Sequence, residues 1–251
     1  MQELKNRVRE GYSRAWVVSK YSKIGLWPSE REICWTFWKT GERVLDLGCG
    51  AGRTTIPLHQ EGYLPVGVDI AQPMVAQAKR LAERLAPAIP FGAADATDLP
   101  FKDNSFHGIL FSYNGIELIP KQEGKVAALA EAWRVLRPDG HLIFTTHAFE
   151  AFNRYAPARL QRLALDLANR LLRRAPRDAE FGEIIPDPDR TVEVYYMQIN
   201  SPRKYRKLLR KAGFELAYYN SRSRVESDKR ATRWADFDAD FKFYVARKVV
   251  Q

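Results

Sequence analysis

The most constraining feature of the sequence is an apolar run at residues 44–47 that leads directly into Gly48, Gly50 and Gly52. The run is typical of a strand buried on both faces, and the glycines allow a sharp turn that brings bare backbone against a ligand. A second apolar run ends at Asp69, whose carboxylate can accept hydrogen bonds from both hydroxyls of a ribose. Together these features predict a nucleotide-type cofactor at the ends of two neighbouring strands.

Apolar runs alternate with helical patterns from about residue 43 to residue 147, which predicts a doubly wound α/β fold. In this region we expect strands at 43–47, 64–69, 90–94, 107–112 and 141–147, and helices at 51–60, 72–86 and 121–136. Farther along, a strand-like run at 191–198 precedes a helix that Ser201 caps and Gly213 ends. The last two strands are expected at 215–220 and 241–250.

The spacing of the glycines distinguishes between two kinds of nucleotide site. A dinucleotide site requires the pattern G-x-G-x-x-G, whose third glycine would fall at position 53, where the chain has Arg53. The observed pattern instead places Asp46 two residues before the first glycine, where a carboxylate suits a cationic group better than a pyrophosphate. An ammonium and a sulfonium therefore fit this loop.

Five segments in order, at residues 46–52, 66–70, 93–101, 106–113 and 136–144, resemble motifs of the class I S-adenosylmethionine-dependent methyltransferases. The resemblance implies a mostly parallel seven-stranded sheet with an antiparallel last strand, and S-adenosyl-L-methionine as the cofactor. It also implies that the acid after the third strand meets the adenine amine. The cofactor-binding residues expected on this basis are Asp46, Gly48, Cys49, Gly50, Gly52, Asp69, Ile70, Met74, Asp95, Ala96, Ser112 and Tyr12.

One segment departs from a subgroup of that family. After the fourth strand, the members that methylate exocyclic amines of bases have Asn-Pro-Pro-Tyr, whereas this chain has Ser112-Tyr113-Asn114-Gly115. The resemblance therefore does not extend to the chemistry of base amines.

Two segments lie outside the pattern of the sheet. Residues 1–40 are rich in tryptophan and tyrosine, and we expect them to form a helical cap over the cofactor, joined to a methyltransferase domain at 41–251. An insertion at about 148–190 contains a basic amphipathic helix near residues 158–175, with leucines on one face and arginines on the other. Its place after the fifth strand predicts a substrate lid, with contact to a membrane surface and simple packing as alternatives.

Open α/β sheets bind ligands beyond the carboxyl ends of their strands. His147 ends a strand on that side, so it is our candidate general base. The site of the methyl acceptor can be lined by residues that follow the fourth strand at the same edge of the sheet, and by the strand-like run after the insertion. The candidate substrate residues are Tyr113, Asn114, Glu117 and Tyr196, and a structural role is the alternative for each of them and for His147.

The chain has 251 residues and a formal net charge of +10, and the positive excess lies mainly in residues 154–177 and 203–230. Such patches favour an anionic acceptor, partner or surface, and they also serve as an ordinary solvated surface. Two cysteines and the lack of a long apolar stretch predict a reducing, cytoplasmic location without a transmembrane segment. No spacing of ligand residues indicates a metal, and we expect a monomer or a homodimer.

These observations predict a methyltransferase that acts on a small-molecule acceptor. The alternative is a tRNA or other RNA methyltransferase that binds nucleic acid through the basic insertion and the basic helix after Ser201. A third interpretation is a non-catalytic protein that has kept the cofactor pocket.

Overall fold

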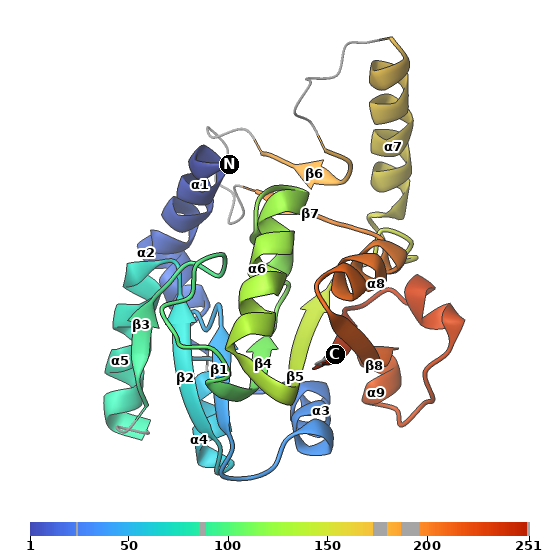
Figure 1. Ribbon diagram of the computed structural model, residues 1–251. Coiled ribbons are helices and arrows are strands. Elements are labelled where there is room, and N and C mark those ends of the chain that lie inside the picture. Colours follow the sequence, from blue (N-terminus) through green and yellow to red (C-terminus); the bar gives the residue numbers. More distant parts are fainter. Residues whose placement is uncertain (24, 86–88, 173–179, 187–195, 250–251) are drawn as a thin grey trace.

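The computed structural model describes residues 1–23, 25–85, 89–172, 180–186 and 196–249. The strands of its central sheet are β1 (Arg43–Leu47), β2 (Leu64–Asp69), β3 (Phe91–Ala93), β4 (Phe106–Phe111), β5 (Leu136–Thr146), β8 (Phe214–Ser221) and β9 (Lys242–Lys248). They form a seven-stranded sheet in the order β3-β2-β1-β4-β5-β9-β8 (Figure 1). The first five strands pair in parallel, and β9 is antiparallel to both of its neighbours. The predicted α/β class and the antiparallel last strand are confirmed.

The helices surround this sheet in the expected order. They are α1 (Gln2–Ser13), α2 (Ala15–Lys20), α3 (Pro28–Phe37), α4 (Thr55–Gln60), α5 (Gln72–Leu85), α6 (Lys121–Val135), α7 (Ala156–Leu171), α8 (Pro202–Lys211) and α9 (Arg222–Val225), with short 3-10 helices η1 (Gly115–Leu118) and η2 (Arg233–Phe237). As predicted, Ser201 caps α8, because its hydroxyl accepts a hydrogen bond from the Lys204 amide.

Within residues 43–147, two elements begin four or more residues from their predicted positions. α4 begins at Thr55 rather than at residue 51, because the glycine turn continues up to Thr54. β5 begins at Leu136 rather than at residue 141. Leu136 already pairs with Phe106 of β4, and a register shift takes up the turn-like residues before His141 resumes the pairing.

Side chains of successive strand residues enter hydrophobic clusters on opposite faces of the sheet. On one face, Leu45 of β1 packs in a cluster with α6 and α8. On the other face, Val44 packs with Ile33 and Cys34 of α3 and with Leu58 of α4. This alternation follows from the two-residue period of a strand, and it explains why both faces need helical cover. Cys34 is buried and free, as is Cys49.

The N-terminal segment divides between the sheet and the mouth of the parallel strands. α3 shares the core of one sheet face, so residues 28–37 are not part of a cap. α2 contributes Val17 and Val18 to a separate small cluster with Ala51, Ala71 and Met74, and Tyr12 of α1 packs against that cluster. α1 and α2 therefore lie at the end of the sheet where the glycine turn follows β1.

The insertion after β5 contains α7, which stands away from the body of the protein at the same end of the sheet (Figure 1). A short antiparallel pair, β6 (Glu183–Ile184) and β7 (Met197–Gln198), lies farther along it. β7 occupies the end of the strand predicted at 191–198. Residues 173–179 and 187–195 lie outside the described part of the chain, and with them the end of the predicted helix. No helix in the described ranges has the length and apolar character needed to cross a membrane.

Candidate functional site

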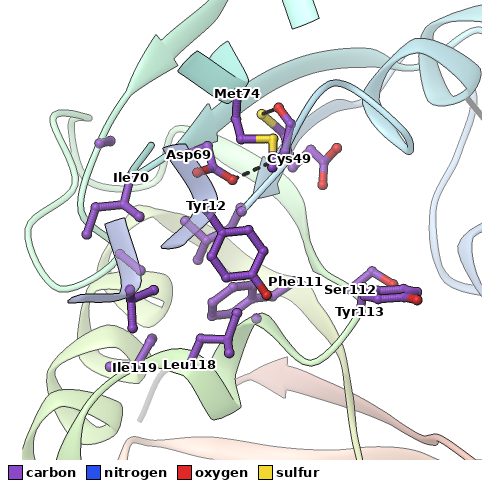
Figure 2. Close-up of a pocket in the computed structure, with 18 of the residues that line it drawn as sticks. Tyr12, Cys49, Asp69, Ile70, Met74, Phe111, Ser112, Tyr113, Leu118 and Ile119 are labelled. Carbon is purple, nitrogen blue, oxygen red and sulfur yellow. Dashed lines mark hydrogen bonds between the residues drawn. The ribbon is translucent and has the colours of Figure 1, made fainter. Parts of the chain in front are cut away.

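A pocket opens at the carboxyl ends of β1, β2 and β4, where ligands bind in sheets of this type. It encloses about 1060 Å³, including the part open to solvent. Figure 2 shows Tyr12 of α1 across its centre, with Asp69, Ile70 and Met74 on one side and Leu118 and Ile119 on the other. The predicted residues that line it are Tyr12, Asp46, Gly48, Cys49, Gly50, Asp69, Ile70, Met74, Asp95, Ala96, Ser112 and Tyr113.

The glycine turn forms the floor of this pocket. Gly48 and Gly50 have φ angles of +70° and +54°, in the left-handed region that favours glycine. The Gly48 and Cys49 amides both donate to the carbonyl of Val68, and the Gly50 amide donates to Oδ2 of Asp69 at 2.9 Å. The turn is therefore tied to the end of β2. Gly52 is not among the lining residues, and a Cβ there would press on Ile56, which indicates a packing role.

Asp46 is buried beneath the turn. Both Thr54 and Thr55 donate their hydroxyls to its Oδ2 at 2.5 Å. Burial raises the pKa of the Asp46 carboxyl to about 6, even though the two hydroxyls and the Arg53 guanidinium favour its ionised form. A cationic ligand group beside Asp46 would compensate this cost of burying a carboxylate.

Asp69 lies at the tip of β2, with its carboxylate at the edge of the pocket (Figure 2). The amide of Ala71 donates to Oδ1 at 2.8 Å and the amide of Gly50 to Oδ2. Burial raises the pKa of Asp69 above its ordinary value, and these backbone donors oppose the rise. The donors fix the direction of the carboxylate relative to the turn.

Asp95 follows β3 and holds α1 in place. The Lys5 ammonium of α1 contacts its Oδ2 at 2.7 Å, and the amide and hydroxyl of Thr97 donate to Oδ1. Partial burial opposes ionisation, but the Lys5 ammonium and the Thr97 donors hold the pKa of Asp95 below its ordinary value. The sequence analysis did not identify Lys5, whose partner lies 90 residues away in the chain.

A second ion pair that the sequence analysis missed supports the wall of the pocket. Arg53 donates to both carboxylate oxygens of the fully buried Glu30, at 2.9 and 2.6 Å. The Ser112 hydroxyl also donates to Glu30. Arg53 lies over the ring of Trp27 at 5.2 Å and the ring of Tyr113 at 5.5 Å. The sequence signalled this ion pair only through Arg53, which stands where a dinucleotide site would have its third glycine. It did not indicate Glu30 as the acidic partner.

Beside the pocket lies an aromatic cluster, which we define as Tyr21, Trp27, Tyr113 and Phe241. Its ring centroids are 5.0–5.8 Å apart, and Tyr21 and Tyr113 also line the pocket. The ring of His147 lies 4.8 Å from that of Phe241. The cluster therefore connects the pocket to His147, which is not itself a lining residue.

His147 and Glu117, predicted separately, are in direct contact. Nδ1 of His147 lies 2.7 Å from Oε2 of Glu117, and the His147 amide donates to Oε1 at 2.9 Å. Glu117 is fully buried, whereas about a third of the His147 side chain is exposed. A carboxylate at Nδ1 favours the tautomer with the proton there and leaves Nε2 as a proton acceptor.

The other two candidate substrate residues lie outside the pocket lining. Asn114 is buried, and its backbone amide donates to the Thr145 hydroxyl at 3.1 Å. The hydroxyl of Tyr196 donates to Glu183 at 2.9 Å and accepts from the Lys121 amide at 2.8 Å. Tyr196 thus joins the segment around β6 and β7 to the start of α6.

Comparisons with known proteins agree with this geometry. Residues 44–140 match the family model described as a methyltransferase domain. The chain is 40% identical over 105 residues to a demethylmenaquinone methyltransferase of Beutenbergia cavernae, an alignment that covers 42% of this chain and 40% of that protein. The chain thus spans about two fifths of the length of that relative.

Two solved structures share the fold. A SAM-dependent methyltransferase from Methanosarcina mazei matches with a TM-score of 0.68 and 20% identity, over 91% of this chain and 100% of that one. A 1,6-didemethyltoxoflavin-N1-methyltransferase from Burkholderia thailandensis, solved with its acceptor and S-adenosylhomocysteine, matches with a TM-score of 0.59 and 17% identity, over 89% of this chain and 77% of that one. At these identities the likeness concerns the fold alone.

Proposed function

Because residues 44–140 form a class I S-adenosylmethionine-dependent methyltransferase domain, we propose that this protein transfers the methyl group of S-adenosyl-L-methionine to a small-molecule acceptor. The single observation that supports the proposal most strongly is the convergence of Asp46, Gly50, Asp69 and Asp95 on one pocket. These residues come from three separate segments, and each has a chemical counterpart in that cofactor.

The residues present fit the cofactor well. Asp46 is a buried carboxylate whose side-chain hydrogen bonds in the described residues come from the neutral hydroxyls of Thr54 and Thr55, so it suits the ammonium of the methionine part. Asp69 suits the ribose hydroxyls, and the left-handed Gly50 keeps the approach to them open, since a Cβ there would meet nothing within 4 Å. Ile70, Met74 and Leu118 offer apolar surface to the adenine.

The cofactor supplies an activated methyl group, so the chain has to align the acceptor and exclude water. Such alignment contributes up to about 7–11 kcal/mol to the lowering of a reaction barrier. We infer that the aromatic cluster holds a flat acceptor, because its rings offer faces and edges for stacking beside the pocket. Nε2 of His147 then takes a proton from an acceptor hydroxyl or amine, while Glu117 orients the imidazole.

The match to a demethylmenaquinone methyltransferase supports a small-molecule acceptor. The alternative prediction, an RNA acceptor, depends on the basic insertion and on the basic α8. In α8, Arg206 pairs with Asp236 at 3.1 Å and covers the Tyr219 ring, whereas Arg203 and Lys204 are exposed. An RNA acceptor requires RNA binding that weakens steeply with salt.

Calorimetry with S-adenosylhomocysteine tests the cofactor site. We expect Asp69→Ala and Gly50→Val each to abolish measurable binding, the first by removing the ribose partner and the second by forcing a branched residue into a left-handed conformation. Unchanged affinity in both variants would contradict the site. His147→Ala is the matched variant outside the pocket lining, and we expect it to keep cofactor affinity.

A methyl-transfer assay tests the acceptor side with the same variants. With a panel of aromatic hydroxyl and amine compounds, His147→Ala should lower turnover by about 10²–10⁴-fold. Undiminished turnover would remove His147 from the reaction. Cofactor binding without transfer to any compound would favour the non-catalytic interpretation.

A further inference from the structure

The apolar face of α7 is open to solvent. On this face Leu160 is 62% exposed, Leu167 52% and Leu171 83%. Leu165 and Leu172, which lie off this face, are exposed as well. None of these leucines lines the pocket, so α7 does not close over it in this structure. A row of leucines exposed over several helical turns marks an interaction surface rather than ordinary scattered exposure.

An exposed aromatic patch lies at the base of α7. Phe152 is 72% exposed, and it stacks on Phe237 of η2 with ring centroids 5.3 Å apart. Trp234, 61% exposed, lies 6.0 Å from the same ring, and Tyr155 at the start of α7 is also exposed. The Phe152 amide donates to the Phe237 carbonyl at 2.8 Å, so two loops far apart in sequence are joined here. Exposed tryptophan and tyrosine are typical of groups that lie at a membrane–water boundary.

The segment that carries α7 is strongly basic in sequence, and two acids near the aromatic patch are paired, Asp236 with Arg206 and Asp238 with Arg224. Residues 154–177 contain seven arginines and one acidic residue. Lys229 and Arg230, just before η2, are exposed. Leucines along one helix face with arginines elsewhere in the same segment are the pattern of helices that lie in the plane of an anionic lipid surface. A partner protein would need a matching acidic and apolar face, and a second copy that docked through the same segment would bring like charges together.

We propose that α7, with the aromatic patch at its base, docks the protein on the surface of an anionic lipid bilayer. The leucines of α7 and the rings of Phe152 and Trp234 enter the boundary between headgroups and acyl chains, and the exposed side chains of Arg154, Lys229 and Arg230 meet the lipid phosphates. α7 follows β5, whose carboxyl end lies at the same edge of the sheet as the pocket (Figure 1).

Vesicle co-sedimentation of the full chain tests this surface. Vesicles of phosphatidylcholine alone are compared with vesicles of phosphatidylcholine and phosphatidylglycerol, at low and at high salt. We expect binding to the anionic vesicles that weakens with salt, and Leu167→Glu/Leu171→Glu should lower the partition coefficient by at least about tenfold. The matched control, Leu64→Glu/Leu85→Glu, adds the same charge at two exposed leucines of β2 and α5 and should bind like the parent protein.

Four outcomes would overturn the proposal. They are no binding to either vesicle, equal loss in the control variant, self-association by light scattering that Leu167→Glu/Leu171→Glu abolishes, and salt-sensitive binding to an RNA oligonucleotide without binding to vesicles. Because the substituted leucines are exposed, circular dichroism and the thermal midpoint should stay unchanged in all variants. The assay contains neither cofactor nor acceptor, so its result is independent of the proposed methyl transfer.

Discussion

Asp46 should make cofactor affinity depend on pH, because its carboxyl is buried and has a pKa of about 6 in the free protein. The ammonium of S-adenosylhomocysteine pairs with the ionised carboxylate only. The dissociation constant should therefore rise about twofold at pH 6 and about elevenfold at pH 5, relative to its value at about pH 8. Below pH 6 the loss approaches tenfold for each further pH unit.

Isothermal titration calorimetry with S-adenosylhomocysteine between about pH 5 and pH 8 measures this dependence. Methylthioadenosine is the matched ligand, because it keeps the adenine, the ribose and the sulfur but lacks the ammonium. Its affinity reports on Asp69, whose pKa burial also raises, and should not follow the Asp46 titration. In Asp46→Asn, S-adenosylhomocysteine should bind about 10- to 150-fold more weakly at neutral pH and show no Asp46 transition.

The same carboxyl affects stability with a defined sign. Its pKa is about 6 in the folded protein against an ordinary value of 3.8, so the folded state binds the proton more tightly than the unfolded chain. The free energy of unfolding should therefore fall by up to about 3 kcal/mol as the pH rises from about 4 to 6, and Asp46→Asn should remove this loss. A flat pH profile for S-adenosylhomocysteine, or an equal decline for methylthioadenosine, would refute the assignment of the titration to Asp46.

Three further predictions concern buried charges outside the glycine turn. Arg53→Met leaves Glu30 buried without its cation and should lower the free energy of unfolding, measured in urea, by about 3–5 kcal/mol. The double variant Glu30→Gln/Arg53→Met should restore part of this loss. Losses of the two single variants that simply add in the double variant would contradict this. Glu117→Gln should lower turnover by about 10- to 100-fold with unchanged cofactor affinity, and a loss that His147→Ala does not share would contradict a positioning role. Burial lowers the pKa of Lys125 to about 7, so between about pH 7 and 10 the lysine stays protonated in the unfolded chain but not in the folded protein. The free energy of unfolding should therefore rise over this range. Urea melts at a series of pH values measure the rise, and Lys125→Met should flatten it.

Most of the residues that we propose bind the cofactor could be brought to one pocket from the sequence alone, because they are local. β1, the glycine turn and the tip of β2 lie within residues 43–69. There the apolar residues favour buried strands and the glycines favour a sharp turn. Gly48 and Gly50 have the left-handed φ angles that their spacing implied. Gly52 also has a positive φ, of +88°, but it does not line the pocket, and a Cβ there would press on Ile56.

The ion pairs were not predictable because their partners are far apart in the chain. Lys5 and Asp95 are separated by 90 residues, and Arg53 and Glu30 by 23. Charge alone does not select one acid among the 30 in the sequence as the partner of a given cation. Only the packing of α1 and α3 against the sheet brings these groups together.

The residues that we propose contact the acceptor include some that topology could place and some that only the folded packing brings together. Topology alone placed His147 and Tyr113 at the carboxyl edge of the sheet, but Trp27 and Phe241 come from opposite ends of the chain and meet there only in the folded protein. Each of these four residues belongs to a different connecting segment, whereas the glycine turn is contiguous. A change in one connecting segment can therefore alter the acceptor without disturbing Asp46 or Asp69, which is the physical reason why one cofactor site serves many acceptors in folds of this kind.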